Sequence, residues 1–317
     1  MTQTHEPATP AAPAAAPPAW LPLAAVSTTL VLWASAFVAI RHLGGDFSAG
    51  PLSLGRLLVG AVALGVVTVL MRRGAPLPRP TGRQWVSIAT IGILWFGVYN
   101  VALNEGEQRV DAGTAAMLIQ VSPVLIAVLA AVFLDERFTP QLALGLTLAF
   151  GGVALIGLSG SPDGDRDLVG VGLCLLAAVV YAVSLVLQKP LVARLPAVMI
   201  TWLACTIGAV ACLPYAGGLV DEVGDAPTSS VAWLVYLGVF PTAIAFSTYA
   251  YALKHMSASS LGVTTYVVPV ITIVLSLVFL DEVPPGLAYV GGALALVGVA
   301  VARRRARPRT VATTLPR

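Results

Sequence analysis

The stretch VSPVLIAVLAAVFLDE at positions 121–136 returns as VVPVITIVLSLVFLDE at positions 267–282, with ten identical residues at an offset of 146. The match continues without a gap on both sides, so that Ala112–Ala154 lies over Ala258–Ala300 with 17 identities in 43 positions. Shared apolar composition would give far fewer identities, so the chain contains an internal repeat.

The beginning of each half shows the same relation at an offset of 148. There, Trp33, Ala34 and Arg41 lie over Tyr181, Ala182 and Lys189. The two matches together indicate two copies of one unit.

The composition indicates that this chain lies in lipid. Of 317 residues, 57% are hydrophobic and only 10% are charged, whereas soluble domains carry about 25% charged residues. A membrane helix needs about 20 apolar residues, and ten runs qualify; strands of a membrane barrel would instead alternate in polarity. The predicted spans are Leu21–Ile40, Leu52–Met71, Trp85–Leu103, Ala112–Leu134, Gln141–Ser159, Leu168–Leu187, Ala197–Leu219, Val231–Leu253, Ser257–Leu280 and Gly286–Ala302.

Equivalent points of the two halves are five spans apart. Because five is odd, the halves must enter the membrane in opposite directions, which places Asp135–Glu136 and its copy Asp281–Glu282 on opposite sides. Inverted repeats are the architecture of secondary transporters, since two opposed units give outward-open and inward-open states of similar energy. A duplication that yields only a stable bundle is the alternative.

The basic residues predict the orientation. With a cytoplasmic N-terminus, 14 of the 18 Lys and Arg residues fall in inside segments, as expected for cytoplasmic loops. The predicted fold is therefore all-α and integral to the membrane, with ten transmembrane helices in two inverted five-helix repeats and both termini cytoplasmic. Its parts are a disordered Ala/Pro-rich tail (1–19), the first repeat (20–160), the second repeat (161–303) and a basic tail (304–317).

Several motifs together resemble one known family. They are Leu32–Arg41 on the first span, Pro123 with Phe133–Arg137, Gly145 and Gly152–Val153, and the second-half copy Pro269 with Phe279–Glu282, Gly291 and Gly298–Val299. In these motifs the chain is similar to EamA-type transporters of the drug/metabolite transporter superfamily, over roughly residues 25 to 303. The resemblance implies two five-helix halves around a central cavity and export of small metabolites, amino acids or drugs.

Arg56 is a candidate binding residue, because it lies about one turn inside the second span and a charge at that depth is functional by default. It could meet a substrate carboxylate, or its side chain could extend to the membrane interface. Glu105 and Glu107 flank the outer end of the third span and are interpreted as solvated loop carboxylates.

Polar and aromatic side chains at membrane depth are expected to face the bundle interior and line a cavity. With Arg56, the candidates are Trp33, Ser35, Phe37, Tyr99, Asn100, Gln120, Tyr181, Gln188, Tyr249 and Tyr266. Helix–helix hydrogen bonding and interfacial aromatic belts are the alternative explanation. Pro123 and Pro269 lie inside the fourth and ninth spans and are predicted hinges, because proline removes a backbone hydrogen bond.

The sequence favours a transporter over other classes. It contains no metalloprotease, nucleophile-elbow or nucleotide-binding motif, and its three histidines are too scattered for a metal site. We therefore expect no catalytic residue, metal or cofactor. The prediction is a secondary exporter that works by alternating access in the plasma membrane of a bacterium, with a small-molecule substrate and lipid as its partners and no nucleic acid. A homodimer is compatible with the sequence, and a membrane-embedded enzyme or a channel is the alternative function.

Overall fold

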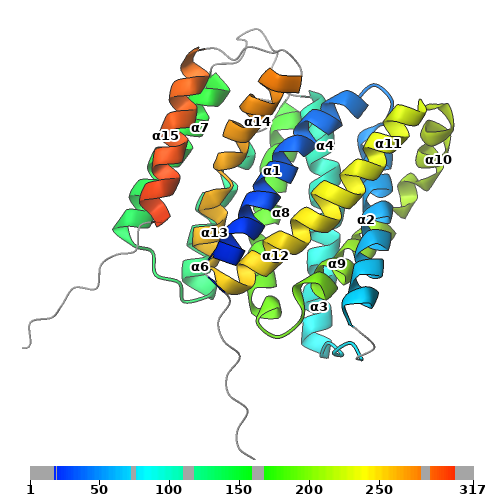
Figure 1. Ribbon diagram of the computed structural model, residues 1–317, viewed down its shortest axis with the longest axis horizontal. Coiled ribbons are helices and arrows are strands. Elements are labelled where there is room, and N and C mark those ends of the chain that lie inside the picture. Colours follow the sequence, from blue (N-terminus) through cyan, green and yellow to red (C-terminus); the bar gives the residue numbers. More distant parts are fainter. Residues whose placement is uncertain are drawn as a thin grey trace, which may run out of the picture.

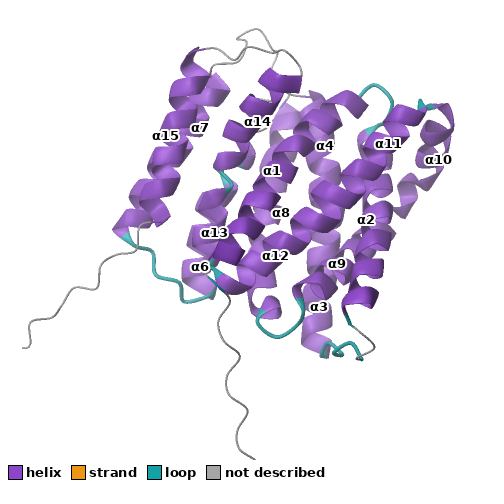
Figure 2. Ribbon diagram, in the orientation of Figure 1, coloured by secondary structure: helices purple, strands orange, loops and turns teal. Residues whose placement is uncertain are grey.

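The computed structural model describes residues 18, 20–72, 76–109, 118–158, 168–279 and 286–303, and within these ranges it is helical without any strand (Figure 2). Several expectations fall on residues outside these ranges. They concern the two predicted tails apart from Pro18, the start of the fourth span from Ala112 to Met117, Ser159, and the Asp281–Glu282 pair.

The helices of the first half follow the predicted spans. They are α1 (Trp20–Leu43), α2 (Ala49–Met71), α3 (Gly82–Ile91), η1 (Gly92–Val98), α4 (Tyr99–Arg109), α6 (Ser122–Phe133) and α7 (Pro140–Leu158). The π-helix η1 joins α3 to α4, so the third span runs without interruption over Gly82–Arg109.

The second half follows a similar order, with η2 and α10 added after the helix that corresponds to α2 (Figure 1). Its helices are α8 (Leu168–Val192), α9 (Ala197–Ala211), η2 (Leu213–Tyr215), α10 (Ala216–Asp225), α11 (Thr228–Leu237), η3 (Gly238–Ile244), α12 (Ala245–His255), α13 (Ala258–Thr264), α14 (Val267–Phe279) and α15 (Gly286–Arg303). Here η3 is the π-helix that joins α11 to α12.

Within the described residues, five helices are long and apolar enough to cross a membrane, so this is a multi-pass membrane protein. A sixth candidate is α9 together with the helix that follows it, which are bent by 53°. The predicted span Ala197–Leu219 is therefore broken rather than continuous, because α9 ends at Ala211 and the chain turns at Cys212. Pro214 lies in the new turn, where its ring and missing N–H oppose continuation of the helix.

Helices α7 and α15 are equivalent members of the repeat, and they pack against each other (Figure 1). A Cβ atom added to Gly152 would lie 2.4 Å from the backbone nitrogen of Ala295, and one added to Gly298 would lie 2.3 Å from that of Ala149. These two contacts are the same contact seen from each half, because the offset of 146 maps Gly152 onto Gly298 and Ala149 onto Ala295. The pairing also shows that α7 and α15 run antiparallel.

The two π-helices occupy equivalent positions, since an offset of 146 carries Gly92–Val98 onto Gly238–Ile244. The first residue of each π-helix is a glycine that lies in close contact with the neighbouring helix. A Cβ at Gly92 would lie 2.7 Å from the carbonyl oxygen of Ala204, and a Cβ at Gly238 would lie 2.9 Å from that of Arg56. Arg56 and Ala204 are themselves 148 residues apart, so the two halves use matching contacts and the fold has an internal two-fold relation.

The predicted fourth and ninth spans are interrupted within one residue of equivalent points. A turn at Gln120–Val121 precedes α6, and a turn at Thr265–Tyr266 separates α13 from α14. Pro123 and Pro269 follow these turns and lie in the first turn of their helices. Backbone N–H groups in the first turn of a helix have no partner within that helix, so proline removes no hydrogen bond there. Each helix is therefore interrupted in the turn before its proline, and the proline itself lies in regular helix.

Candidate solute cavity

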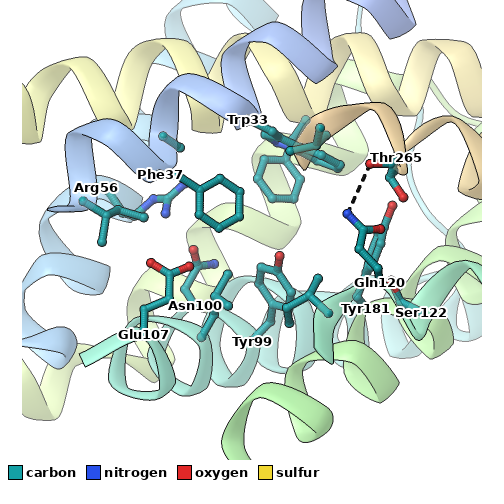
Figure 3. Close-up of a pocket in the computed structure, with 16 residues that line it drawn as sticks. Trp33, Phe37, Arg56, Tyr99, Asn100, Glu107, Gln120, Ser122, Tyr181 and Thr265 are labelled. Carbon is teal, nitrogen blue, oxygen red and sulfur yellow. Dashed lines mark hydrogen bonds between the residues drawn. The ribbon is translucent and has the colours of Figure 1, made fainter. Parts of the chain in front are cut away.

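A cavity lies at the centre of the helix bundle, with about 660 Å³ of space that is free of protein atoms and partly open to the surroundings. Side chains from both halves line it (Figure 3). The lining residues are Trp33, Ala36, Phe37, Ile40, Arg56, Tyr99, Asn100, Leu103, Glu107, Ile119, Gln120, Ser122, Tyr181, Phe246, Thr265 and Val268.

Arg56 marks one end of the cavity and is only 6% exposed. Its Nε donates a hydrogen bond to Thr242 Oγ1 at 3.1 Å, and Thr242 Oγ1 in turn donates to the Leu237 carbonyl at 2.8 Å. This chain of bonds fixes the guanidinium, whose terminal nitrogens remain beside the cavity. Of the two alternatives for Arg56, the structure therefore favours the interior position over extension to the interface.

Glu107 lies at the same end as Arg56, on α4, within electrostatic reach of the guanidinium (Figure 3). The prediction of a solvated loop carboxylate is wrong for Glu107, because α4 continues to Arg109 instead of ending near Leu103. Its spacing from Asn100 is seven residues, which puts both on one helix face. Glu105 differs, since it forms an exposed i,i+4 salt bridge with Arg109 at 2.8 Å.

Asn100 connects the cavity wall to the π-helix. Its Nδ2 donates to the carbonyl oxygens of Trp95 at 3.2 Å and Phe96 at 2.9 Å, both in η1. Widened helical turns leave carbonyls poorly paired, and the amide satisfies two of them. Asn100 therefore holds the shape of η1 while it lines the cavity.

Aromatic rings form the middle of the cavity. The Trp33 ring centroid lies 5.4 Å from that of Phe246 and 6.1 Å from that of Tyr181, and Tyr99 lies 6.2 Å from Tyr181. Behind them, buried Trp95 supports Tyr181 at 5.1 Å. Such edge and tilted contacts give a rigid apolar wall, and the ring faces also attract cations.

Gln120, Ser122 and Thr265 mark the other end, at the interruptions of the fourth and ninth spans (Figure 3). Gln120 Nε2 donates to the Thr265 carbonyl at 3.3 Å, which links the two interrupted helices. The cavity is therefore apolar in its middle and polar at both ends.

Four predicted lining residues lie outside this cavity. Ser35 bonds to the Leu32 carbonyl at 2.8 Å and to the Tyr236 hydroxyl at 2.7 Å. Tyr249 is fully buried behind the wall, where its hydroxyl meets that of Tyr181 at 2.5 Å. The other two are buried Gln188 and Tyr266.

The cavity also contains residues that the sequence analysis missed: Glu107, Ser122, Thr265 and Phe246. Helical spacing from Asn100 points to Glu107, and the repeat alignment, which places Phe246 opposite Asn100, points to Phe246. The position of Ser122 and Thr265 in the cavity could be predicted only if the interruptions of the fourth and ninth spans were known. Across the part of the chain that the structure describes, no cluster of His, Cys, Asp and Glu could hold a metal ion.

The model of the EamA-like transporter family matches this chain twice, at residues 20–158 and at residues 168–304. The chain belongs to the EamA-like transporter family. This confirms the resemblance drawn from the motifs, and the two matches fall on the two halves of the repeat.

Proteins with similar sequences are also named as transporters. A protein of Streptantibioticus cattleyicolor, named a probable terminal-alkyne amino-acid exporter, is 39% identical over 294 residues that cover 92% of this chain and 96% of the relative. The uncharacterized transporter YdfC of Bacillus subtilis is 32% identical and covers 86% of this chain and 88% of its own. A solved crystal structure with 23% identity superposes with a TM-score of 0.72 over 89% of this chain and 96% of that one, which shows the shared fold. Family and relatives together indicate a transporter rather than an enzyme.

Proposed function

We propose that this protein exports small amino acids whose side chains have an apolar stem across the plasma membrane of a bacterium, as a secondary transporter. One observation carries the proposal: a cavity that offers a buried cation and a carboxylate at one end and aromatic rings beside them. The relative named as an amino-acid exporter supports the same substrate class.

The two charged groups suit the head of an amino acid. The guanidinium of Arg56 can hold the substrate carboxylate through paired N–H donors, which is the geometry that arginine offers best. Glu107 can accept from the substrate ammonium group. Both interactions are strong in a cavity of low dielectric constant.

The aromatic wall of Trp33, Tyr99, Tyr181 and Phe246 then receives the side chain of the substrate. Burying an aliphatic chain of three or four carbons against it is favourable by about 0.8 kcal/mol per CH₂ group. A site of this kind accepts many apolar side chains and distinguishes poorly between neighbours in size. We therefore expect a carrier that is selective for the amino-acid head and tolerant of the length and branching of the apolar stem.

Alternating access is the mechanism that we propose, with two inverted five-helix units, residues 20–160 and 161–303, rocking about the cavity. The antiparallel α7–α15 pair and the equivalent π-helices support inversion. The shorter apolar helices supply the four spans that the longer ones leave out, which supports ten in all. The distribution of Arg and Lys supports cytoplasmic termini.

Counterflow into proteoliposomes tests the function. Vesicles loaded with unlabelled L-norleucine should accumulate labelled L-norleucine transiently and saturably, whereas hexylamine and hexanoate, which each lack one charged group of the head, should compete weakly. A panel of other metabolites and cationic drugs provides the comparison. If folded protein gives no counterflow with any amino acid but gives it with another class, the proposed substrate class is wrong; conduction without saturation would indicate a channel.

A further inference from the structure

The end of the cavity opposite Arg56 is formed where the two interrupted spans meet. Gln120 is 5% exposed and Ser122 is 1% exposed, and both line the cavity. Neither Gln120 Oε1 nor Ser122 Oγ has a hydrogen-bond partner among the residues that the structure describes. Buried polar atoms normally have partners, so these two require an explanation.

The direction of the Gln120 amide follows from its neighbour. A backbone carbonyl can only accept, so the amide nitrogen must face the Thr265 carbonyl, 3.3 Å away. The amide oxygen therefore points elsewhere and has only acceptor capacity to offer.

Thr265 also offers a hydrogen-bond acceptor to the cavity. Its hydroxyl donates to the Gly262 carbonyl at 2.8 Å, which uses its only proton and leaves the oxygen lone pairs available. Thr265 lines the cavity as well. This end therefore presents acceptors from Gln120, Ser122 and Thr265 and one donor, the Ser122 hydroxyl proton, while Arg56 at the opposite end presents donors only (Figure 3).

We propose that Gln120, Ser122 and Thr265 form a second polar subsite, which selects amino acids that carry a hydrogen-bond donor at the far end of the side chain. This inference rests on the proposed function, because the head group must sit at Arg56 for the side chain to reach the far end. A hydroxyl or ammonium group there satisfies the buried acceptors, whereas a methyl group leaves them unpaired.

Four amino acids with unbranched side chains of four heavy atoms isolate the donor. 5-Hydroxynorvaline ends in a hydroxyl, ornithine in an ammonium group, O-methylhomoserine carries an ether acceptor only, and norleucine is apolar. The measured quantity is competition against labelled norleucine, expressed within each variant as affinity relative to norleucine. We expect wild type to prefer 5-hydroxynorvaline to norleucine by about tenfold, as one hydrogen bond predicts, and to prefer O-methylhomoserine less than 5-hydroxynorvaline, because only the Ser122 hydroxyl can donate to its ether oxygen.

Two substitutions test Gln120 directly. Gln120→Leu should reduce the preference for 5-hydroxynorvaline, because only Ser122 and Thr265 then remain as acceptors. Gln120→Glu replaces the amide by a carboxylate and should raise the affinity for ornithine relative to norleucine by at least tenfold, a gain that misfolding cannot produce. Gly151→Ala, at a position where an added Cβ meets nothing within 4 Å, should keep the wild-type ratios.

The outcomes separate the two proposals. Absence of norleucine transport with folded protein would overturn the proposed function. Transport of norleucine with equal affinity for all four amino acids, in wild type and both variants, would overturn the second subsite alone. A sodium requirement that Gln120→Leu removes without changing any ratio would also overturn it, by assigning these oxygens to a cation.

Discussion

The two halves of the chain agree in their scaffold and differ in their cavity. Each half contributes one π-helix at the same position, and each opens it with a glycine against the neighbouring helix. Gly152 and Gly298 make the same close approach from opposite sides of the α7–α15 pair. In these contacts, the two halves are structurally equivalent.

The residues that carry chemistry do not repeat. Arg56, Asn100, Glu107 and Gln120 correspond to Ala204, Phe246, Leu253 and Tyr266. One half thus supplies both charges and the Gln120 amide oxygen, which has no hydrogen-bond partner among the described residues, and the other supplies Phe246 at the position of Asn100. The two halves therefore differ in role: the shared contacts form the scaffold, and the differences create a polar, oriented cavity.

The largest expected effect comes from making the halves alike at Arg56. Arg56→Ala introduces the alanine that the second half carries at the equivalent position 204. Because hydrogen bonds to charged groups contribute about 1.5–3 kcal/mol, we expect norleucine counterflow to fall by roughly 10- to 150-fold. The amount of folded protein is measured alongside, because Arg56→Ala also removes the bond to Thr242 and the cation beside Glu107, and both losses can lower stability.

Arg56→Lys is the matched control, because it keeps the charge but loses the planar fork. It should give an intermediate rate. Normal counterflow in Arg56→Ala would show that Arg56 has a structural role only.

The next effect tests the scaffold that the halves share. Gly152→Val and Gly298→Val each drive a side chain into backbone atoms less than 2.5 Å from the new Cβ, so neighbours cannot move aside cheaply. We expect each to lower the free energy of unfolding by about 1–3 kcal/mol or more, as overpacking does. Thermal unfolding in detergent measures this.

The internal two-fold relation predicts that the two valine variants behave alike. Gly151→Ala is the control, since the space around Gly151 is open. A large loss in one valine variant with none in the other would show that the α7–α15 contact is less symmetrical than the geometry indicates.

Much of the fold could be predicted because it depends on patterns that lipid imposes. Apolar runs of span length and the match at an offset of 146 were enough to predict the helices and the repeat. The bend at Cys212 was missed because the apolar run continues through it, and only Pro214 marks the turn. The π-helices were missed because no residue type requires them, although glycines 92 and 238 stand at their starts.

The site was predicted in part. Trp33, Phe37, Arg56 and Tyr181 line the cavity as expected, because large or polar groups at membrane depth turn inward. Ser35, Gln188, Tyr249 and Tyr266 satisfy the same rule but face other helices or lie behind the wall. Depth in the membrane decides that a side chain is buried, and the rotation of its helix decides what it faces.

A smaller loss of stability is expected from removing a hydrogen bond that has no counterpart in the repeat. Tyr249 has Leu103 as its counterpart, so its hydroxyl bond to Tyr181 has no equivalent elsewhere. Tyr249→Phe should lower the free energy of unfolding by about 1 kcal/mol, the typical contribution of one hydrogen bond. Counterflow should change little, because Tyr181 keeps its place in the cavity wall. Denaturation monitored by Trp fluorescence measures the first quantity, and a loss above about 3 kcal/mol would mean that the pair also holds the backbone.

The smallest expected effects are in transport rates, and they test whether the two interrupted spans act as a symmetrical pair of hinges. In Pro123→Ala and Pro269→Ala, the new backbone N–H allows the helix to extend back through the turn that precedes it. Each interruption would then bend less readily, and we expect each variant to slow counterflow by roughly two- to fivefold, a barrier change below about 1 kcal/mol. Uptake per molecule of inserted protein measures this, with Pro196→Ala, at the start of α9, as a control that should not change the rate.

Equal slowing in both variants would support a paired motion of the two halves. Slowing in Pro123→Ala alone would instead place the moving element beside Gln120, on the half that carries the charges, and unchanged rates in both would leave the interruptions as parts of the binding site without a role in the motion.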